Sequence, residues 1–225
     1  MWYDQITIKL LIMATYTDGI NGSFKGKVGT VIGSSWKGKA YMKSLHHPRT
    51  IPPHKLEQQN RNKFAMAHHW LKEESVKEFV RAGFKGYSAT VEGFLAAKSC
   101  LLKNAFTGEG EEMRIDPALA QVSYGQLPLP SNITADKIEP NEVQISWDAT
   151  KKNDEGACDQ VMILAYDIEN KVATSTITGQ FRYVGFDTIR LPPGKPERTY
   201  HIYAAFVAAD RSCQSPGIYL GTVNN

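Results

Sequence analysis

The chain has 225 residues, of which 42% are hydrophobic and 22% are charged, and this composition excludes a disordered chain. No apolar run approaches the roughly 20 residues that a bilayer-spanning helix needs, so we expect no membrane span. The net charge of +3 conceals an asymmetry, because residues 22–103 carry 15 Lys and Arg against 5 Glu, whereas residues 126–225 carry 9 basic and 12 acidic residues. This division predicts two units with different surfaces. It would suit complementary faces in an assembly, a polyanionic partner or simply solvated lysines.

The first twelve residues are interpreted as an extension that precedes a natural start at Met13. The apolar stretch from Ile6 to Ala14 is short, and Lys9 is its only basic residue. A secretory signal needs a basic leader, a longer apolar segment and a small-residue cleavage site. We therefore expect no signal peptide, and a protein that is cytoplasmic or associated with a particle.

The segment after this start has the period-two alternation of half-buried strands. Phe24–Ile32 and Trp36–Leu45 predict a β-hairpin that turns at Gly33-Ser34-Ser35. Each strand carries lysines on one face, and its glycines suit bulges or close packing. The candidate residues for binding a protein partner or a polyanion are seven basic side chains in and after this hairpin: Lys25, Lys27, Lys37, Lys39, Lys43, Arg49 and Arg61.

Two apparent ligand motifs in this region are set aside. The stretch from Gly33 to Ala40 nearly fits a phosphate-binding loop, but Ala40 lacks the hydroxyl that would hold magnesium and no helix is predicted to follow. Five of the six histidines lie between His46 and His69. Adjacent histidines on a helix point apart, however, and no cysteine is near them. We therefore predict neither a metal site nor a cofactor.

Two helical segments are predicted after the proline-rich connector. The first covers residues 54–82, as one long helix or a kinked pair, and glycine follows its last turn. The second covers residues 88–107 and is capped by Ser88. The short connection favours an antiparallel helical pair. Phe64 and Phe94 are expected in the core of this pair.

Residues 113–130 predict a linker, because they contain three prolines and follow no regular period. The domain organisation is then an extension at 1–12, a basic hairpin-plus-helices domain at 13–112, this linker, and a β-sandwich at 131–225. Limited proteolysis is expected to cut within the linker and to leave a stable C-terminal fragment. The predicted fold class is α+β.

Short strands at regular intervals, separated by Gly and Pro turns, predict the C-terminal sandwich. Trp147 lies on an early strand, and Leu191-Pro192-Pro193-Gly194 precedes a strong strand that begins at Tyr200. This arrangement resembles the fibronectin type III module. The resemblance implies an immunoglobulin-like sandwich with Trp147 in the core and Tyr200 as its corner tyrosine. Such sandwiches usually act as binding or spacer modules.

A second resemblance covers nearly the whole chain from Met13 onward. Its motifs are DGINGSFKGKVGTVIG at residues 18–33, Trp36-Lys37-Gly38, Arg61-Asn62-Lys63-Phe64, Gly83-Phe84, residues 104–108 and Tyr219-Leu220-Gly221. These resemble a domain-of-unknown-function family from Bacteroidota. Members commonly have a Thr-x-x-Gln capping box before Arg-x-x-Phe, where this chain has His54 and Glu57. The hairpin-proline-helix pattern is also similar to segments of phage and prophage virion proteins. Neither resemblance implies an activity.

No enzyme constellation is found in the sequence. It has no Gly-x-Ser-x-Gly nucleophile elbow, no Cys-x-x-Cys pair and no dinucleotide fingerprint. The leading hypothesis is a non-catalytic structural or assembly subunit, whose basic N-terminal domain docks to itself or to a larger assembly. The alternative is a nucleic-acid-binding protein that uses the lysine-rich hairpin, with Trp36 and Tyr41 available for stacking.

Overall fold

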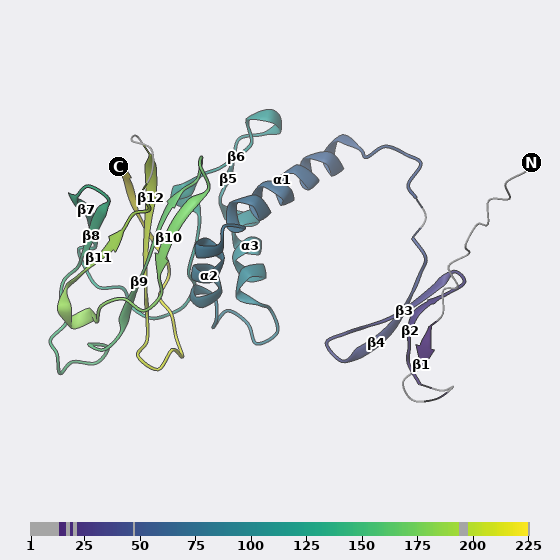
Figure 1. Cartoon of the computed structure of the whole chain (residues 1–225), viewed down its shortest axis with the longest axis horizontal. Coiled ribbons are helices and arrows are strands. Elements are labelled where there is room, and N and C mark those ends of the chain that lie inside the picture. Colours follow the sequence, from purple (N-terminus) through teal and green to yellow (C-terminus); the bar gives the residue numbers. More distant parts are fainter. Residues whose placement is uncertain (1–13, 17–18, 20–21, 47, 194–197, 225) are drawn as a thin grey trace, which may run out of the picture. The chain divides into compact units, whose positions relative to one another are not determined.

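The computed structural model describes residues 14–16, 19, 22–46, 48–193 and 198–224 (Figure 1). It contains helices and antiparallel sheets, so the predicted mixture of α and β structure is confirmed. The chain divides into two compact units, residues 1–53 and residues 54–225. Among the described residues, no helix is both long and apolar enough to cross a membrane.

The N-terminal unit contains a four-stranded antiparallel sheet in which each strand pairs with the next along the chain. Its strands are β1 (Thr15–Tyr16), β2 (Phe24–Val28), β3 (Val31–Trp36) and β4 (Lys39–Ser44). Two-residue turns join β2 to β3 and β3 to β4. Gly29 has a φ of +57° in the first turn, and Lys37 and Gly38 have φ values of +48° and +77° in the second. Such positive angles are the ones that match the twist of paired strands.

The predicted turn at Gly33-Ser34-Ser35 is wrong, because these residues lie inside β3. Gly33 is buried, and a Cβ at this position would collide with the carbonyl oxygen and the ring of Phe24. The glycine is therefore needed for close packing rather than for a turn. The true turn carries Lys37 in a left-handed conformation that lysine seldom adopts.

The C-terminal unit begins with three helices rather than two. They are α1 (Lys55–Leu71), α2 (Glu74–Gly83) and α3 (Gly93–Asn104). The kinked pair expected over 54–82 corresponds to α1 and α2. His54 caps α1, since its Nδ1 accepts the Leu56 N–H at 3.4 Å, and Glu73 caps α2 by accepting the Val76 N–H at 2.8 Å.

The third helix begins at Gly93, five residues later than predicted. Ser88 does not cap it, because the Ser88 hydroxyl accepts the backbone N–H of Thr90 in a local turn. Glu92 occupies the N-cap position, and its carboxylate pairs with Arg81 on α2 at 2.8 Å. Residue spacing alone does not show this contact between the N-cap of α3 and α2.

Two antiparallel sheets form the rest of this unit, with strand orders β10-β9-β12-β13 and β11-β8-β7. The strands are β7 (Thr134–Glu139), β8 (Glu142–Ser146), β9 (Gln160–Asp167), β10 (Val172–Thr176), β11 (Phe186–Arg190), β12 (Thr199–Val207) and β13 (Ile218–Asn224). Shorter elements are the pair β5 (Phe106–Thr107) and β6 (Arg114–Ile115) and the 3₁₀ turns Gly110–Glu112, Pro117–Leu119 and Arg182–Val184.

Both faces of the β9–β12 sheet are buried. Along β9, Val161, Ile163 and Ala165 face a core that the two sheets share. The alternate residues Met162 and Leu164 face a second core, which the three helices complete. The helices therefore form a third layer on the outer side of this sheet, as Figure 1 shows.

Residues 113–130 are not an exposed linker. Ser123 is fully buried, and its hydroxyl lies 3.1 Å from the Gly83 carbonyl oxygen and 2.7 Å from that of Ser215. The backbone N–H of Leu127 also donates to the Gln214 carbonyl at 3.0 Å. This segment is therefore hydrogen-bonded both to the end of α2 and to the connection between β12 and β13. The chain consequently divides at residues 53 and 54, and the helices belong with the sheets.

Candidate binding surfaces

The register of the N-terminal sheet brings three of the predicted lysines together. Lys27 lies opposite Ile32, Ile32 lies opposite Lys43, and Trp36 lies opposite Lys39. Because side chains alternate between faces along a strand, these lysines share one face with Trp36 and with Tyr41. This set, Lys27, Trp36, Lys39, Tyr41 and Lys43, is called the lysine face.

The other two hairpin lysines are placed differently. Lys37 lies in the β3–β4 turn, with its Nζ 5.0 Å from the centroid of the Trp36 ring, which is a cation–π contact. Lys25 lies beyond Gly26, whose φ of +124° bends β2. Neither lysine is therefore assigned to the lysine face by strand register.

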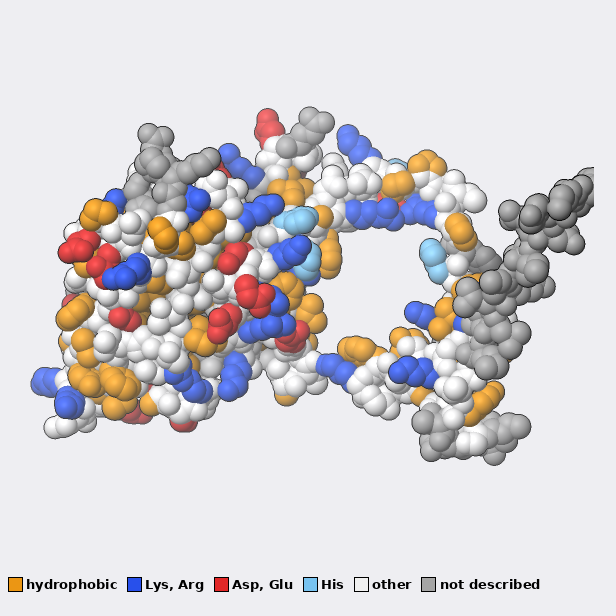
Figure 2. Space-filling view, in the orientation of Figure 1, with side chains coloured by type: hydrophobic (Ala, Val, Ile, Leu, Met, Phe, Trp, Pro, Cys, Tyr) orange, Lys and Arg blue, Asp and Glu red, His pale blue; other side chains and the backbone are white. Residues whose placement is uncertain are grey.

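The opposite side of the sheet is apolar. Val28, Val31 and Met42 lie there, with exposed fractions of 51%, 37% and 71%. These three side chains form what is called the apolar face. The described residues 14–46 include no Asp or Glu, and Figure 2 shows no acidic side chain on the described part of this unit. Gly33 is the only one of these described residues that is buried. The N-terminal sheet thus has no hydrophobic core of its own among the described residues.

The two predicted arginines lie outside the sheet. Arg49 lies in the connector that follows β4. Arg61 lies on α1 and pairs with Glu57 one turn earlier, at 2.6 Å between Nη2 and Oε1. Its charge is therefore balanced locally. Neither arginine is a residue of the sheet that carries the lysine face.

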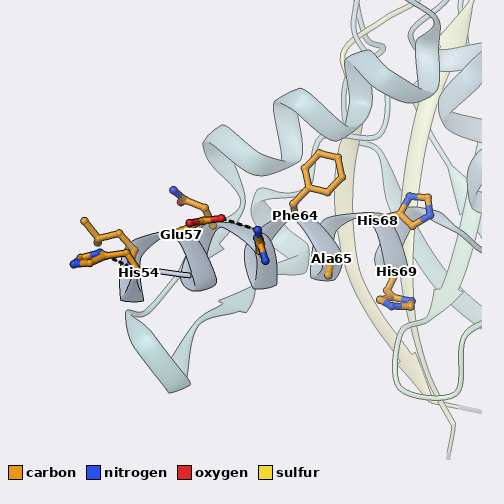
Figure 3. Close-up of a pocket in the computed structure, with 9 residues that line it drawn as sticks. His54, Glu57, Phe64, Ala65, His68 and His69 are labelled. Atoms are coloured by element: carbon orange, nitrogen blue, oxygen red, sulfur yellow. Dashed lines mark hydrogen bonds and ion pairs between the residues drawn. The ribbon is translucent and has the colours of Figure 1, made fainter. Parts of the chain in front are cut away.

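Phe64 is not a core residue, although its spacing on α1 predicted one. Its side chain is 54% exposed and lines a hollow of about 710 Å³ along α1, together with His54, Glu57 and His68. Figure 3 shows Phe64 and His68 on one side of the helix, and Ala65 and His69 on the other. Only the last turn of α1 contributes buried side chains among the described residues, Ala67, Trp70 and Leu71.

One side of the Phe64 ring covers a buried lysine that the sequence analysis missed. The Nζ of Lys98 on α3 lies 4.6 Å from the Phe64 ring centroid, 5.1 Å from that of Phe94, and 3.2 Å from Nδ1 of His68. Burial lowers the pKa of Lys98, and the nearby Lys98 cation, followed by burial, lowers the pKa of His68. Lys98 follows Phe94 by four residues, so helical spacing would have placed it on the apolar stripe.

The histidines of this region do not gather as a metal site. In the part of the chain that the structure describes, no three His, Cys, Asp or Glu side chains are grouped as metal ligands. His68 and His69 diverge on α1, with ring centroids 6.4 Å apart. The chemistry available at α1 is therefore a contact between a lysine, a histidine and two aromatic rings.

The three remaining core candidates lie in the C-terminal unit. Phe94 is partly buried against the core beneath the helices. Trp147 is buried, its Nε1 donates to the Arg182 carbonyl at 2.9 Å, and its ring meets that of Phe206 edge-on at 5.2 Å. Tyr200 is fully buried, with its hydroxyl 3.5 Å from the Pro192 carbonyl oxygen.

Comparison with known proteins gives one match. Residues 23–221 match the profile of a family described as a family of unknown function, DUF6266. No curated protein and no solved structure matches the chain. The match covers the described strands β2–β4, the helices and nearly all of the C-terminal sheets.

Proposed function

The chain belongs to the DUF6266 family of unknown function, and we propose from its own residues that it is a non-catalytic assembly subunit. In this proposal two copies associate through the apolar face of the N-terminal sheet. The association surface lies within residues 14–46. The larger C-terminal unit is the module that each copy brings into the assembly.

The observation that carries the proposal is the missing core of the N-terminal sheet. Val28, Val31 and Met42 are exposed on one face, while Gly33 is the only buried residue among the described residues 14–46. A small sheet is stable in water only when a hydrophobic face is covered. Burying apolar surface contributes about 25 cal/mol per Å². Covering the apolar face would therefore give this sheet the stabilisation that its own residues do not provide.

A second copy is the partner that the chemistry of the two faces favours. The apolar face carries no charge, so the same face of another copy can pack against it without repulsion. The lysine face cannot pair with itself in this way, since like charges would meet. A two-fold contact between identical surfaces is the commonest arrangement in homo-oligomers. Two sheets stacked about 10 Å apart would then enclose a core, with both lysine faces outside.

The C-terminal unit supports the role of a rigid module. Its two sheets share a core that includes Trp147 and Tyr200. With the Tyr200 hydroxyl near Pro192, this supports the inference of a fibronectin type III-like sandwich. We infer that it serves as a spacer or binding module in a larger assembly. A phage-like or surface particle is the assembly suggested by sequence likeness alone.

Light scattering on the full chain tests the proposal. The wild type is expected to be a dimer, and Met42→Glu, which places a charge on the apolar face, is expected to give a monomer. Lys43→Glu is the matched control, because it introduces the same side chain at the next position of β4 but on the opposite face. A monomeric wild type, or a Met42→Glu variant that still dimerises, would reject self-association through this face.

The alternative function is nucleic-acid binding, and the composition of the lysine face favours it. Three lysines share this face with Trp36 and Tyr41, which are 65% and 44% exposed. Single-stranded nucleic acids are bound by such combinations of cations and stacking rings. Affinity for an oligonucleotide should then fall steeply with salt, with a log–log slope of roughly −0.7 per phosphate contacted. Lys27→Glu with Lys43→Glu should abolish this binding, whereas Met42→Glu should preserve it.

A further inference from the structure

A second cavity is lined only by residues of the C-terminal unit. It has a volume of about 420 Å³ and lies between the last turns of α1, the short strand β6 and the β9–β10 hairpin. Its volume is within the range of pockets that bind small molecules, about 300–1,000 Å³. Most of its lining is apolar: Met66, Trp70, Ile115, Tyr166 and Ile168.

The charged side chains of this cavity all have one sign. They are Arg114 and Lys171, no Asp or Glu contributes to the lining, and His69 completes it. No described carboxylate lies within ion-pair distance of Arg114 or Lys171. All three side chains are exposed, so they can meet a ligand at the mouth of the cavity. This arrangement favours a ligand with a negative charge at one end.

The inner wall of the cavity is held in place from several directions. The Tyr166 hydroxyl donates to the Trp70 carbonyl at 3.1 Å, and the Trp70 ring meets the rings of Tyr166 and Tyr203 edge-on, at 5.3 and 6.4 Å. The Nε1 of Trp70 is buried and has no hydrogen-bond partner among the described residues. The Trp70 ring is therefore positioned by its aromatic neighbours rather than by a hydrogen bond of its own N–H.

We propose that this cavity binds a small organic anion that combines an aromatic or branched hydrocarbon group with a carboxylate. The hydrocarbon group would be buried against Trp70 and Tyr166, and the carboxylate would contact Arg114 and Lys171. Arginine in particular recognises a carboxylate with two parallel hydrogen bonds. The proposal does not depend on dimerisation, because every lining residue belongs to the C-terminal unit.

Three probes separate the contributions of ring and charge. The indole N–H signal of Trp70, assigned with Trp70→Phe, is followed by NMR during titration of the full chain. We expect saturable shifts with 3-phenylpropionate, and binding weaker by about tenfold or more with the neutral 3-phenylpropionamide, which loses the charged contacts. Acetate, which lacks the ring, is expected to cause no saturable shift.

Two substitutions test the charged contacts without disturbing the fold. Arg114→Gln removes one cation, and Lys171→Gly removes the other while keeping the turn, since Lys171 has a φ of +56° that glycine adopts readily. Each is expected to weaken 3-phenylpropionate binding by about tenfold. Arg190→Gln on β11 is the matched control and should change nothing. Equal binding of acid and amide, unchanged affinity in both variants, or no saturable shift at all would overturn the proposal.

Discussion

The hydroxyl of Tyr166 on β9 donates a hydrogen bond of 3.1 Å to the carbonyl of Trp70 in the last turn of α1. Burial, with smaller effects of Glu73 and Asp167, raises the pKa of Tyr166 to about 12, so this hydroxyl stays protonated at neutral pH and remains a donor. The Trp70 carbonyl lies at the end of α1, where no following helical N–H is present to donate to it, and the Tyr166 hydroxyl takes that place. Sheet and helices therefore share polar contacts as well as a core.

The first prediction concerns which fragment folds alone. Residues 54–225 should form a stable unit, whereas residues 131–225 should not. Without the helices, the second face of the β9–β12 sheet would expose Met162, Leu164, Tyr166 and Tyr203, and each side chain would lose roughly 1.5–3 kcal/mol of burial. Circular dichroism and thermal unfolding of the two fragments measure this. A cooperative transition in the shorter fragment would contradict it.

The second prediction concerns residues 113–130, which should tolerate little change. A Cβ at Gly125 would collide with the Gln214 carbonyl oxygen. Gly125→Ala is therefore expected to lower the free energy of unfolding by roughly 1–3 kcal/mol through overpacking. The exposed neighbour Gln126 is the control, because Gln126→Ala should stay within about 0.5 kcal/mol of wild type. Denaturant unfolding compares the two variants, and equal stabilities would mean that this segment is loosely attached.

The third prediction compares a buried tryptophan in the C-terminal unit with an exposed one in the N-terminal unit. Trp147→Ala should cost roughly 3–5 kcal/mol, because it leaves a cavity beside Phe206 and removes a hydrogen bond to Arg182. Trp36→Ala should leave the unfolding of residues 54–225 unchanged, since Trp36 is exposed in the other unit. Tyr200→Phe should cost less than about 1 kcal/mol, as its hydrogen bond is long at 3.5 Å. Chemical denaturation of each variant measures these differences.

The local periodicity of the sequence predicts strands and helices, but it does not predict the contacts between residues that are distant in the chain. The alternation over residues 24–32 and 36–45 predicts two strands, and the structure has β2 and β4 within these ranges. The predicted turn at Gly33 is wrong, because this glycine lies inside β3 and accommodates Phe24. The turn at Lys37-Gly38 was missed because lysine rarely takes a positive φ. The contact of Gly33 with Phe24 and the positive φ of Lys37 decide the two positions, and neither can be read from the residue types.

Contacts between residues distant in the chain also explain why residues 113–130 and the surroundings of Phe64 differ from their predictions. Residues 113–130 lack periodicity, yet Ser123 is held by backbone atoms distant in sequence, and no local pattern encodes such partners. Phe64 fits an apolar stripe by spacing, but that part of α1 has little packed against it. Lys98 is buried although its side chain is charged. Its burial depends on two aromatic rings, one of them on another helix.

The last prediction concerns pH and rests on His201. Burial lowers the pKa of His201, more than the carboxylates of Asp167, Glu169 and Asp116 raise it. The Nδ1 of the neutral His201 ring can accept a hydrogen bond from the Tyr219 hydroxyl, which lies 2.9 Å away. In the unfolded chain the pKa returns to its ordinary value of 6.5. The unfolded state therefore binds a proton first as the pH falls.

Folding stability should consequently be fully present above pH 6.5 and decline as the pH falls from there toward the lowered pKa of the folded state. His68 contributes in the same direction, because the Lys98 cation and burial lower its pKa as well. His201→Gln should remove part of this acid sensitivity, since glutamine does not titrate. Denaturant midpoints of wild type and variant, measured on both sides of that pH, check the difference. If the variant loses as much stability on acidification as the wild type does, the partly buried His201 is not the titrating group.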